Sequence, residues 1–186
     1  MIQKASDVVL NVLPLFVSVE HKYYYEGPCR FGSGEALQPG FDRLANEQNA
    51  RDCLDKLNEY APEGVRILEP VRFARTDDWD NREELWEAMA PAVHAADFVV
   101  AMCGIGGDDI VAEFAERFRK PMAIAPKALF STSIVTATLN SKGKDYEVYG
   151  VYQWDNMPAL LSTMRARKVI QTTRILLATR FGSNTS

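Results

Sequence analysis

The sequence predicts an α/β domain with a doubly wound, mostly parallel sheet of five to six strands, a three-layer sandwich of the flavodoxin or Rossmann type. Short apolar runs rich in β-branched residues alternate with longer stretches of helical periodicity. One such run, residues 98–102, leads through a glycine-rich turn directly into a helix, as a parallel crossover requires. A length of 186 residues suits one domain, and we expect residues 1–186 to form a single α/β domain.

The strands of the first half are short apolar runs bounded by prolines. Residues 8–13 are almost continuously apolar, as expected of a strand buried on both faces, and Pro14 is expected to end its hydrogen bonding. Residues 65–73 predict a second strand, which is interrupted or ends at Pro70. Between them, residues 20–40 are rich in glycine and proline. An irregular segment of that length usually carries function or is ordered by a partner.

Two helices accompany these strands. Residues 41–60 repeat apolar positions near the helical period and are followed by Gly64. Asp78 or Asp80 can cap a second helix that runs to about residue 95, and Pro91 inside it predicts a kink or an early end. The positions expected to face inward on this helix are Leu85, Trp86, Met89 and Val93.

The second half continues the alternation of strands and helices. The helix after the glycine-rich turn is expected to end at Lys120 and to bury Ile110, Val111, Phe114 and Phe118. Further strands are predicted over residues 122–125, 148–152 and 174–179, a helix over 157–169, and a partly helical connection over 131–144. A short polar tail follows the last predicted strand, so two alternatives stay open: a complete chain, or the N-terminal part of a longer protein.

The composition argues against several classes of protein. A formal net charge of −4 lacks the cationic footprint of a general nucleic-acid or membrane-surface binder, so we expect neither partner. Cys29, Cys53 and Cys103 have no zinc-binding spacing and are expected to be reduced thiols. The chain opens without a basic-then-apolar signal pattern, and the apolar run 8–19 is too short to span a bilayer. The expected location is therefore the cytoplasm.

The glycine-rich turn is the first candidate binding site, because ligands of open α/β sheets sit beyond the carboxyl ends of the strands. Its candidate residues are Gly104, Gly106, Gly107, Asp108 and Asp109. The glycines allow close approach to the backbone at a helix N-terminus, whereas the carboxylates repel phosphate and accept hydrogen bonds from polyol hydroxyls. The alternatives are a structural turn with Asp108 as N-cap residue and a phosphate site.

Aromatic residues lie next to two predicted strand ends. Trp79 follows the second strand, and Tyr152 and Trp154 lie at the end of the strand predicted over 148–152. Such rings can pack against the apolar C–H face of a sugar, or they can serve as core or interface residues. The sequence contains no complete triad, nucleophile elbow, Walker phosphate loop or zinc-protease motif, so we assign it no catalytic and no metal-binding residue.

Three segments carry a resemblance to a known family. Residues 96–102 lead through the turn to a helix, residues 119–124 follow that helix, and the basic stretch 165–168 precedes a predicted strand with the ending 179–183. In this layout the chain resembles the N-terminal domain of the L-fucose/L-arabinose isomerase family. The resemblance implies a three-domain, metal-dependent aldose–ketose isomerase that assembles as a homo-oligomer. Mn²⁺ or a similar divalent metal would be bound by its later domains.

By the same resemblance, this chain would cap the substrate, a small sugar, and support oligomerisation without being catalytic alone. The candidate substrate-binding residues by position are Glu20, His21, Arg30, Arg75 and Trp79. Two other hypotheses stay open. One is a stand-alone sugar- or nucleoside-binding module. The other is a small flavodoxin-like or deoxyribosyltransferase-like enzyme, in which Asp108 or Asp109 would be the candidate nucleophile.

Overall fold

The computed structural model describes residues 4–19, 41–75, 82–103, 107–126, 129–141 and 146–173. Within these ranges the strands are β1 (Leu10–Val19), β2 (Val65–Ile67), β3 (Val71–Arg75), β4 (Phe98–Cys103), β5 (Met122–Ile124) and β6 (Val148–Gly150). The helices are α1 (Phe41–Tyr60), α2 (Arg82–Ala95), α3 (Asp108–Phe118), α4 (Leu129–Ser141) and α5 (Met157–Thr172). The short 3-10 helices η1 (Ala5–Asp7) and η4 (Trp154–Asn156) precede β1 and α5.

The described strands form one sheet in which every pair is parallel. Their order is β2-β1-β4-β5-β6, with β3 also paired to β1. β3 pairs with residues 15–19 of β1, where β4 already occupies the other side, so β3 continues the line of β2. β2 and β3 thus act as one interrupted strand, and the sheet has the strand order of flavodoxin-like proteins. The predicted fold class, a doubly wound α/β sandwich, is confirmed.

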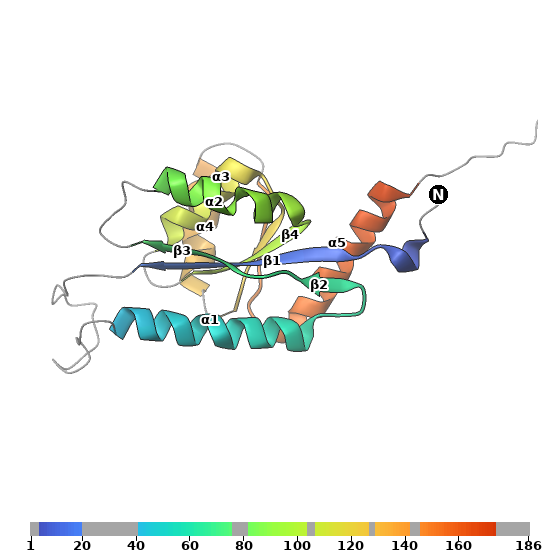
Figure 1. Cartoon of the computed structure of the whole chain (residues 1–186), viewed down its shortest axis with the longest axis horizontal. Coiled ribbons are helices and arrows are strands. Elements are labelled where there is room, and N and C mark those ends of the chain that lie inside the picture. The colour runs from blue at the N-terminus through green and yellow to red at the C-terminus, as the bar shows by residue number, and fades with distance from the viewer. Residues whose placement is uncertain are drawn as a thin grey trace, which may run out of the picture.

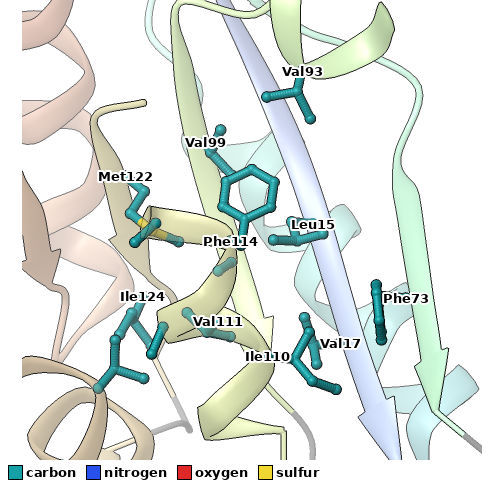
Figure 2. Close-up of a cluster of buried hydrophobic side chains, with 14 of the residues drawn as sticks. Leu15, Val17, Phe73, Val93, Val99, Ile110, Val111, Phe114, Met122 and Ile124 are labelled. Carbon is teal, nitrogen blue, oxygen red and sulfur yellow. The ribbon is translucent and has the colours of Figure 1, made fainter. Parts of the chain in front are cut away.

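Helices cover both faces of the sheet (Figure 1). On one face α1 and α5 contribute Leu57 and Leu161 to the core, and on the other α2, α3 and α4 contribute Trp86, Phe114 and Val135. Figure 2 shows the second core, in which side chains of α3 lie against the strands. These five side chains are completely buried. Burial of a large aliphatic or aromatic side chain contributes about 1.5–3 kcal/mol, so the two apolar cores hold the layers together.

β1 runs unbroken through Pro14, so the prediction that this proline ends its hydrogen bonding is wrong. The amide of Leu10 and the carbonyl of Val12 bond on the β2 side, and alternate residues of a parallel strand share a side. Pro14 therefore directs its missing N–H toward the break between β2 and β3. There three residues, 68–70, oppose two residues of β1, 13–14, in the manner of a bulge. Pro14 therefore needs no backbone N–H at this point, because no regular strand pairing is made there.

Two further prolines test the predicted boundaries. The predicted interruption of the second strand at Pro70 is confirmed, because β2 ends before it and β3 begins after it. In contrast, α2 continues through Pro91 to Ala95, so the prediction that this helix ends early is wrong. Pro91 and Glu87, whose carbonyl loses its helical donor, are both exposed, and water can satisfy that carbonyl.

The remaining differences are at element ends. α4 is a regular helix where the sequence predicts a partly helical connection, α5 extends beyond residue 169, and β6 ends before residue 152. The strand predicted over 174–179 lies outside the described residues. Among the helices that the structure describes, none combines the length and the apolar character needed to cross a membrane.

Candidate functional site

The strand order reverses between β1 and β4, and this is where doubly wound sheets bind their ligands. Val17 of β1 is level with Cys103, the last residue of β4, so the two strands end at the same edge. Along the chain β1 is followed by α1, which covers one face, and β4 is followed by α3, which covers the other. The carboxyl edge of β1 and β4, called the carboxyl edge below, is therefore the candidate site.

α3 begins at the carboxyl edge with Gly107 as its N-cap residue, so the prediction that Asp108 is the N-cap is wrong. The Gly107 carbonyl accepts a 3.1 Å hydrogen bond from the amide of Val111, and Gly107 is buried. Asp108 and Asp109 are instead the first two helical residues. Asp108 is half-buried and Asp109 is exposed. A negative charge in the first turn interacts favourably with the helix dipole and stabilises the helix by about 0.3–1 kcal/mol.

Of the predicted site residues, the consecutive Gly107, Asp108 and Asp109 lie at the beginning of α3. Arg75, another predicted site residue, is the last residue of β3 and pairs with Val19 at the end of β1, so its backbone also reaches the carboxyl edge. Other predicted site residues lie outside the described residues: Glu20, His21, Arg30, Trp79, Gly104 and Gly106.

A polar group that the sequence did not reveal lies between α2 and α3. The indole Nε1 of Trp86 donates a 3.0 Å hydrogen bond to Oε1 of Glu113, and Nη1 of Arg82 lies 3.5 Å from Oε2 of the same carboxylate. Arg82 and Glu113 are thirty-one positions apart. A contact between residues so far apart leaves no periodic pattern in the sequence that could predict it. The only local hint is that Glu113 follows Asp109 by four residues and so shares its helix face.

Of the two aromatic residues after β6, Trp154 has a packing role and Tyr152 is exposed. Trp154 stacks on Tyr60 at the end of α1, with ring centroids 6.4 Å apart. The Tyr60 hydroxyl donates a 3.0 Å hydrogen bond to Asp155, and this bond raises the pKa of Tyr60. Tyr152 is 64% exposed. Tyr60 and Trp154 therefore join α1 to the beginning of α5.

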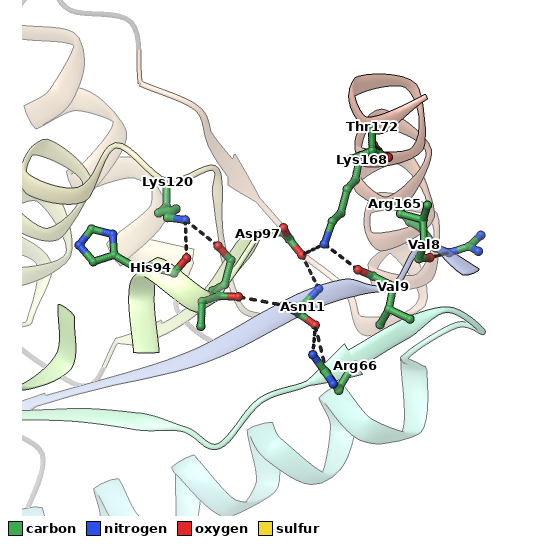
Figure 3. Close-up of polar contacts among 12 residues, drawn as sticks. Val8, Val9, Asn11, Arg66, His94, Asp97, Lys120, Arg165, Lys168 and Thr172 are labelled. Carbon is green, nitrogen blue, oxygen red and sulfur yellow. Dashed lines mark hydrogen bonds and ion pairs between the residues drawn. The ribbon is translucent and has the colours of Figure 1, made fainter. Parts of the chain in front are cut away.

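The opposite, amino edge of the sheet is closed by a polar network (Figure 3). Oδ2 of Asp97 accepts hydrogen bonds from the backbone amide of Asn11, at 2.7 Å, and from Nζ of Lys168, at 2.5 Å. Lys168 also donates to the carbonyl of Val9, and Nε of Arg165 donates to the carbonyl of Val8. The cations of α5 thus bind the chain entering β1, and this edge is held by side chains of α5.

A pocket of about 340 Å³ also lies at the amino edge, between the end of α3 and the start of β6. Its charged residues are engaged with protein groups. Lys120 donates to the carbonyl of Ala96 at 2.6 Å, and the guanidinium of Arg119 lies 4.5 Å from the ring centre of Tyr146. Glu147 is bound by Arg167. These contacts hold the end of α3 and the beginnings of the neighbouring strands in place. We therefore do not place the ligand site here.

The part of the chain that the structure describes contains no group of three or more His, Cys, Asp or Glu side chains able to hold a metal ion. The described residues of the carboxyl edge therefore do not fit a divalent metal bound by three protein ligands. Cys53, on α1, is buried in the apolar core between this helix and the sheet.

Fold and edge geometry together define a flavodoxin-like doubly wound α/β protein with a candidate binding site where β1 and β4 end. No family model, curated protein or solved structure matches the chain.

Proposed function

We propose that this chain binds a polyhydroxylated small molecule, a sugar or a nucleoside, at the carboxyl edge. One observation carries the proposal: α3 starts at the strand-order reversal with a buried glycine cap followed by two carboxylates. The glycine brings backbone close to a ligand, and the carboxylates provide acceptors at the same place.

The chemistry of the two carboxylates selects the ligand class. Sugar hydroxyls are donors that need acceptors, and a hydrogen bond to a charged group contributes about 1.5–3 kcal/mol. A phosphate would meet two like charges in the first turn of α3, and this repulsion opposes the attraction of the helix N-terminus. Asp108 and Asp109 therefore favour hydroxyls over phosphate as the group bound here.

In its particular form, the proposal is that the chain caps the substrate of a metal-dependent aldose–ketose isomerase and supports its oligomerisation. What supports this form is the resemblance in residues 96–102 and 119–124, which here cover all but the last residue of β4 and the whole of β5. The divalent metal, Mn²⁺ or a similar ion, would polarise the sugar oxygens from later domains. The residues of this chain would bind and orient the sugar and exclude water from it.

The binding proposal is tested by calorimetry and thermal shift with L-fucose, L-arabinose, a ribonucleoside and inorganic phosphate as probes. We expect a sugar or nucleoside to stabilise the fold, by about 1.4 kcal/mol at ten times its Kd, and phosphate to have no effect. The double variant Asp108→Asn and Asp109→Asn should weaken binding at least tenfold. Asp55→Asn, an exposed carboxylate of α1, is the matched control and should not change the Kd. Stabilisation by phosphate alone would overturn the proposal.

Mn²⁺ added to the same chain tests the isomerase form. Because the resemblance places the metal ligands in later domains, Mn²⁺ should leave the melting temperature unchanged, and L-fucose or L-arabinose should bind better than a nucleoside. Strong stabilisation by Mn²⁺ alone, or binding of the nucleoside only, would contradict the isomerase form. Nucleoside binding would still agree with the broader proposal.

A further inference from the structure

The pocket at the amino edge is lined by charged groups of both signs. Its volume is about 340 Å³, at the small end of the range of ligand pockets, and its lining residues are Ala115, Arg119, Lys120, Tyr146, Glu147 and Val148. The contacts that these charged residues make with the protein occupy only some of their polar atoms. The atoms that are left determine which ligand the pocket can bind.

The guanidinium of Arg119 has hydrogen-bond donors to offer. Its central carbon lies over the ring of Tyr146, 4.5 Å from the ring centre. Such a contact with an aromatic ring holds the group in place but uses none of its N–H donors. Among the residues that the structure describes, no acceptor binds the Arg119 side chain, which is exposed.

The backbone of Arg119 has a conformation that favours glycine. Its φ is 51°, and in the described part of the chain it is the only residue other than glycine with a positive φ. Arg119 is the C-cap residue of α3, and glycine is common where helices end in this conformation. An arginine here carries a conformational cost. The role of this residue therefore lies in its side chain rather than in its backbone.

Glu147, just before β6, provides the opposite charge. Its Oε1 accepts a 2.7 Å hydrogen bond from the hydroxyl of Tyr149 and also binds Nη1 of Arg167. Because both partners bind the same oxygen, Oε2 has no partner within the described ranges. Glu147 also makes no ion pair there with Arg119, although both line the pocket. A guanidinium and a carboxylate oxygen thus line one pocket without binding each other.

We infer that this pocket binds a small aliphatic α-amino acid. The carboxylate of the ligand accepts hydrogen bonds from the guanidinium of Arg119, and its ammonium group donates to Oε2 of Glu147. Lys120 adds a second positive charge to the lining, and Ala115 and Val148 provide apolar surface for the aliphatic side chain. A ligand with only one charge would leave one of the two protein groups unpaired. This inference is independent of the proposed function, because the proposed sugar site lies at the opposite edge of the sheet.

Calorimetry and thermal shift on the full chain test the inference with L-valine and two analogues that each lack one charge. Isovalerate lacks the ammonium group, and isobutylamine lacks the carboxylate. We expect L-valine to raise the melting temperature, and isovalerate, isobutylamine and inorganic phosphate to bind about tenfold more weakly or not at all. If isovalerate or phosphate binds as tightly as L-valine, the pocket is a simple anion site and the inference is wrong. It is also wrong if L-alanine, L-valine and L-leucine all fail to bind.

Arg119→Gly separates ligand binding from folding. Because glycine suits the backbone here, the variant should melt at the same or a higher temperature, yet its Kd for L-valine should rise about tenfold or more. Arg117→Ala removes a cation two positions earlier on the chain and outside the pocket lining, and should leave the Kd unchanged. Arg119→Asn, which also tolerates a positive φ, repeats the test if Arg119→Gly does not fold. Unchanged binding of L-valine without the arginine would overturn the inference.

A second pair of variants tests the carboxylate. Glu147→Gln and Arg167→Ala break the same ion pair, but only Glu147→Gln removes a charge from the pocket lining. We expect Glu147→Gln to raise the Kd for L-valine about tenfold and Arg167→Ala to change it less than about twofold, although both lower stability. Equal losses of affinity would show that the ion pair only supports the pocket and would contradict the inference. Failure of every sugar and nucleoside to bind would refute the proposed function and leave this inference standing.

Discussion

At the scale of single residues, Gly64 and Arg165 are fitted to each other. Gly64 has φ +79°, a left-handed conformation that other residues adopt at a cost of roughly 1–2 kcal/mol. A Cβ atom at this position would lie 2.2 Å from Nε of Arg165, which donates a 3.0 Å hydrogen bond to the carbonyl of Val8. Glycine is therefore required for its backbone conformation and for the space it leaves.

Gly64→Ala is expected to lower the free energy of unfolding by about 2–3 kcal/mol, because it adds the conformational cost to the loss of the Arg165 hydrogen bond. In an Arg165→Ala background the same change should cost only about 1 kcal/mol, since the clash is gone. Urea unfolding of the four proteins in this cycle measures both values. An identical cost in the two backgrounds would show that the close approach of Arg165 is irrelevant.

The carboxyl of Glu147 makes stability depend on pH. Burial raises the pKa of Glu147, but hydrogen bonds from Arg167 and Tyr149 lower it by more, so the net pKa is below its ordinary value of 4.5. A group with a lowered pKa contributes stability above its unfolded pKa and loses it as the pH falls through the folded value. The stabilising contribution of Glu147 is therefore present at neutral pH and lost in acid.

Glu147→Gln should accordingly cost more stability at pH 7 than at pH 3. The Arg167 and Tyr149 bonds are charge-assisted only while the carboxyl is ionised. Chemical unfolding at the two pH values compares the variant with the unchanged protein. Glu59→Gln, in an exposed pair with Lys56 on α1, serves as the control. A penalty for Glu147→Gln that grows in acid would contradict the direction of the pKa change.

At the scale of elements, one carboxylate is shared between α5 and the sheet. Oδ2 of Asp97 binds the Asn11 amide at the amino end of β1 and Nζ of Lys168 on α5. Both the Lys168 and Asp97 side chains are about three-quarters buried, so this pair is less screened than a surface ion pair. Asp97 directly precedes β4, and its side chain therefore links β1 to α5.

Asp97→Ala is expected to destabilise the protein by about 2–3 kcal/mol, because it leaves a partly buried amide and a partly buried ammonium without this acceptor. Asp97→Asn keeps an oxygen for Asn11 and should cost about 1 kcal/mol. Urea unfolding gives both values, with the exposed Glu59→Gln variant expected below about 0.5 kcal/mol as reference. If all three variants were equally stable, the link would be a surface contact without energetic weight.

Across elements, the hydrophobic pattern predicted most helices and strands but not how prolines sit in them. Periodicity is a property of neighbouring residues and can be read locally. The effect of a proline depends on what its missing N–H faces. For Pro14 that is the break between β2 and β3, and for Pro91 it is the exposed side of α2. These partners are known only once the elements have packed.

At the scale of the whole molecule, the two edges of the sheet have different roles. The amino edge is held by α5 and the chain entering β1, with Lys168 and Arg165 bound to protein groups. At the carboxyl edge β1 and β4 are followed by helices on opposite faces, and α3 begins there with Asp108 and Asp109. The binding experiments with sugars, nucleosides and phosphate therefore test the carboxyl edge as the functional end of the molecule.

The sequence alone determined the α/β class, most of its elements, and the presence of a glycine-rich turn with Asp108 and Asp109 after a buried strand. These features follow from the types of adjacent residues. Only the tertiary structure decided the strand order, the N-cap role of Gly107, and the approach of Arg82 and Trp86 to Glu113. Contacts between residues far apart in sequence depend on which elements pack together, and packing is a property of the whole core rather than of any local pattern.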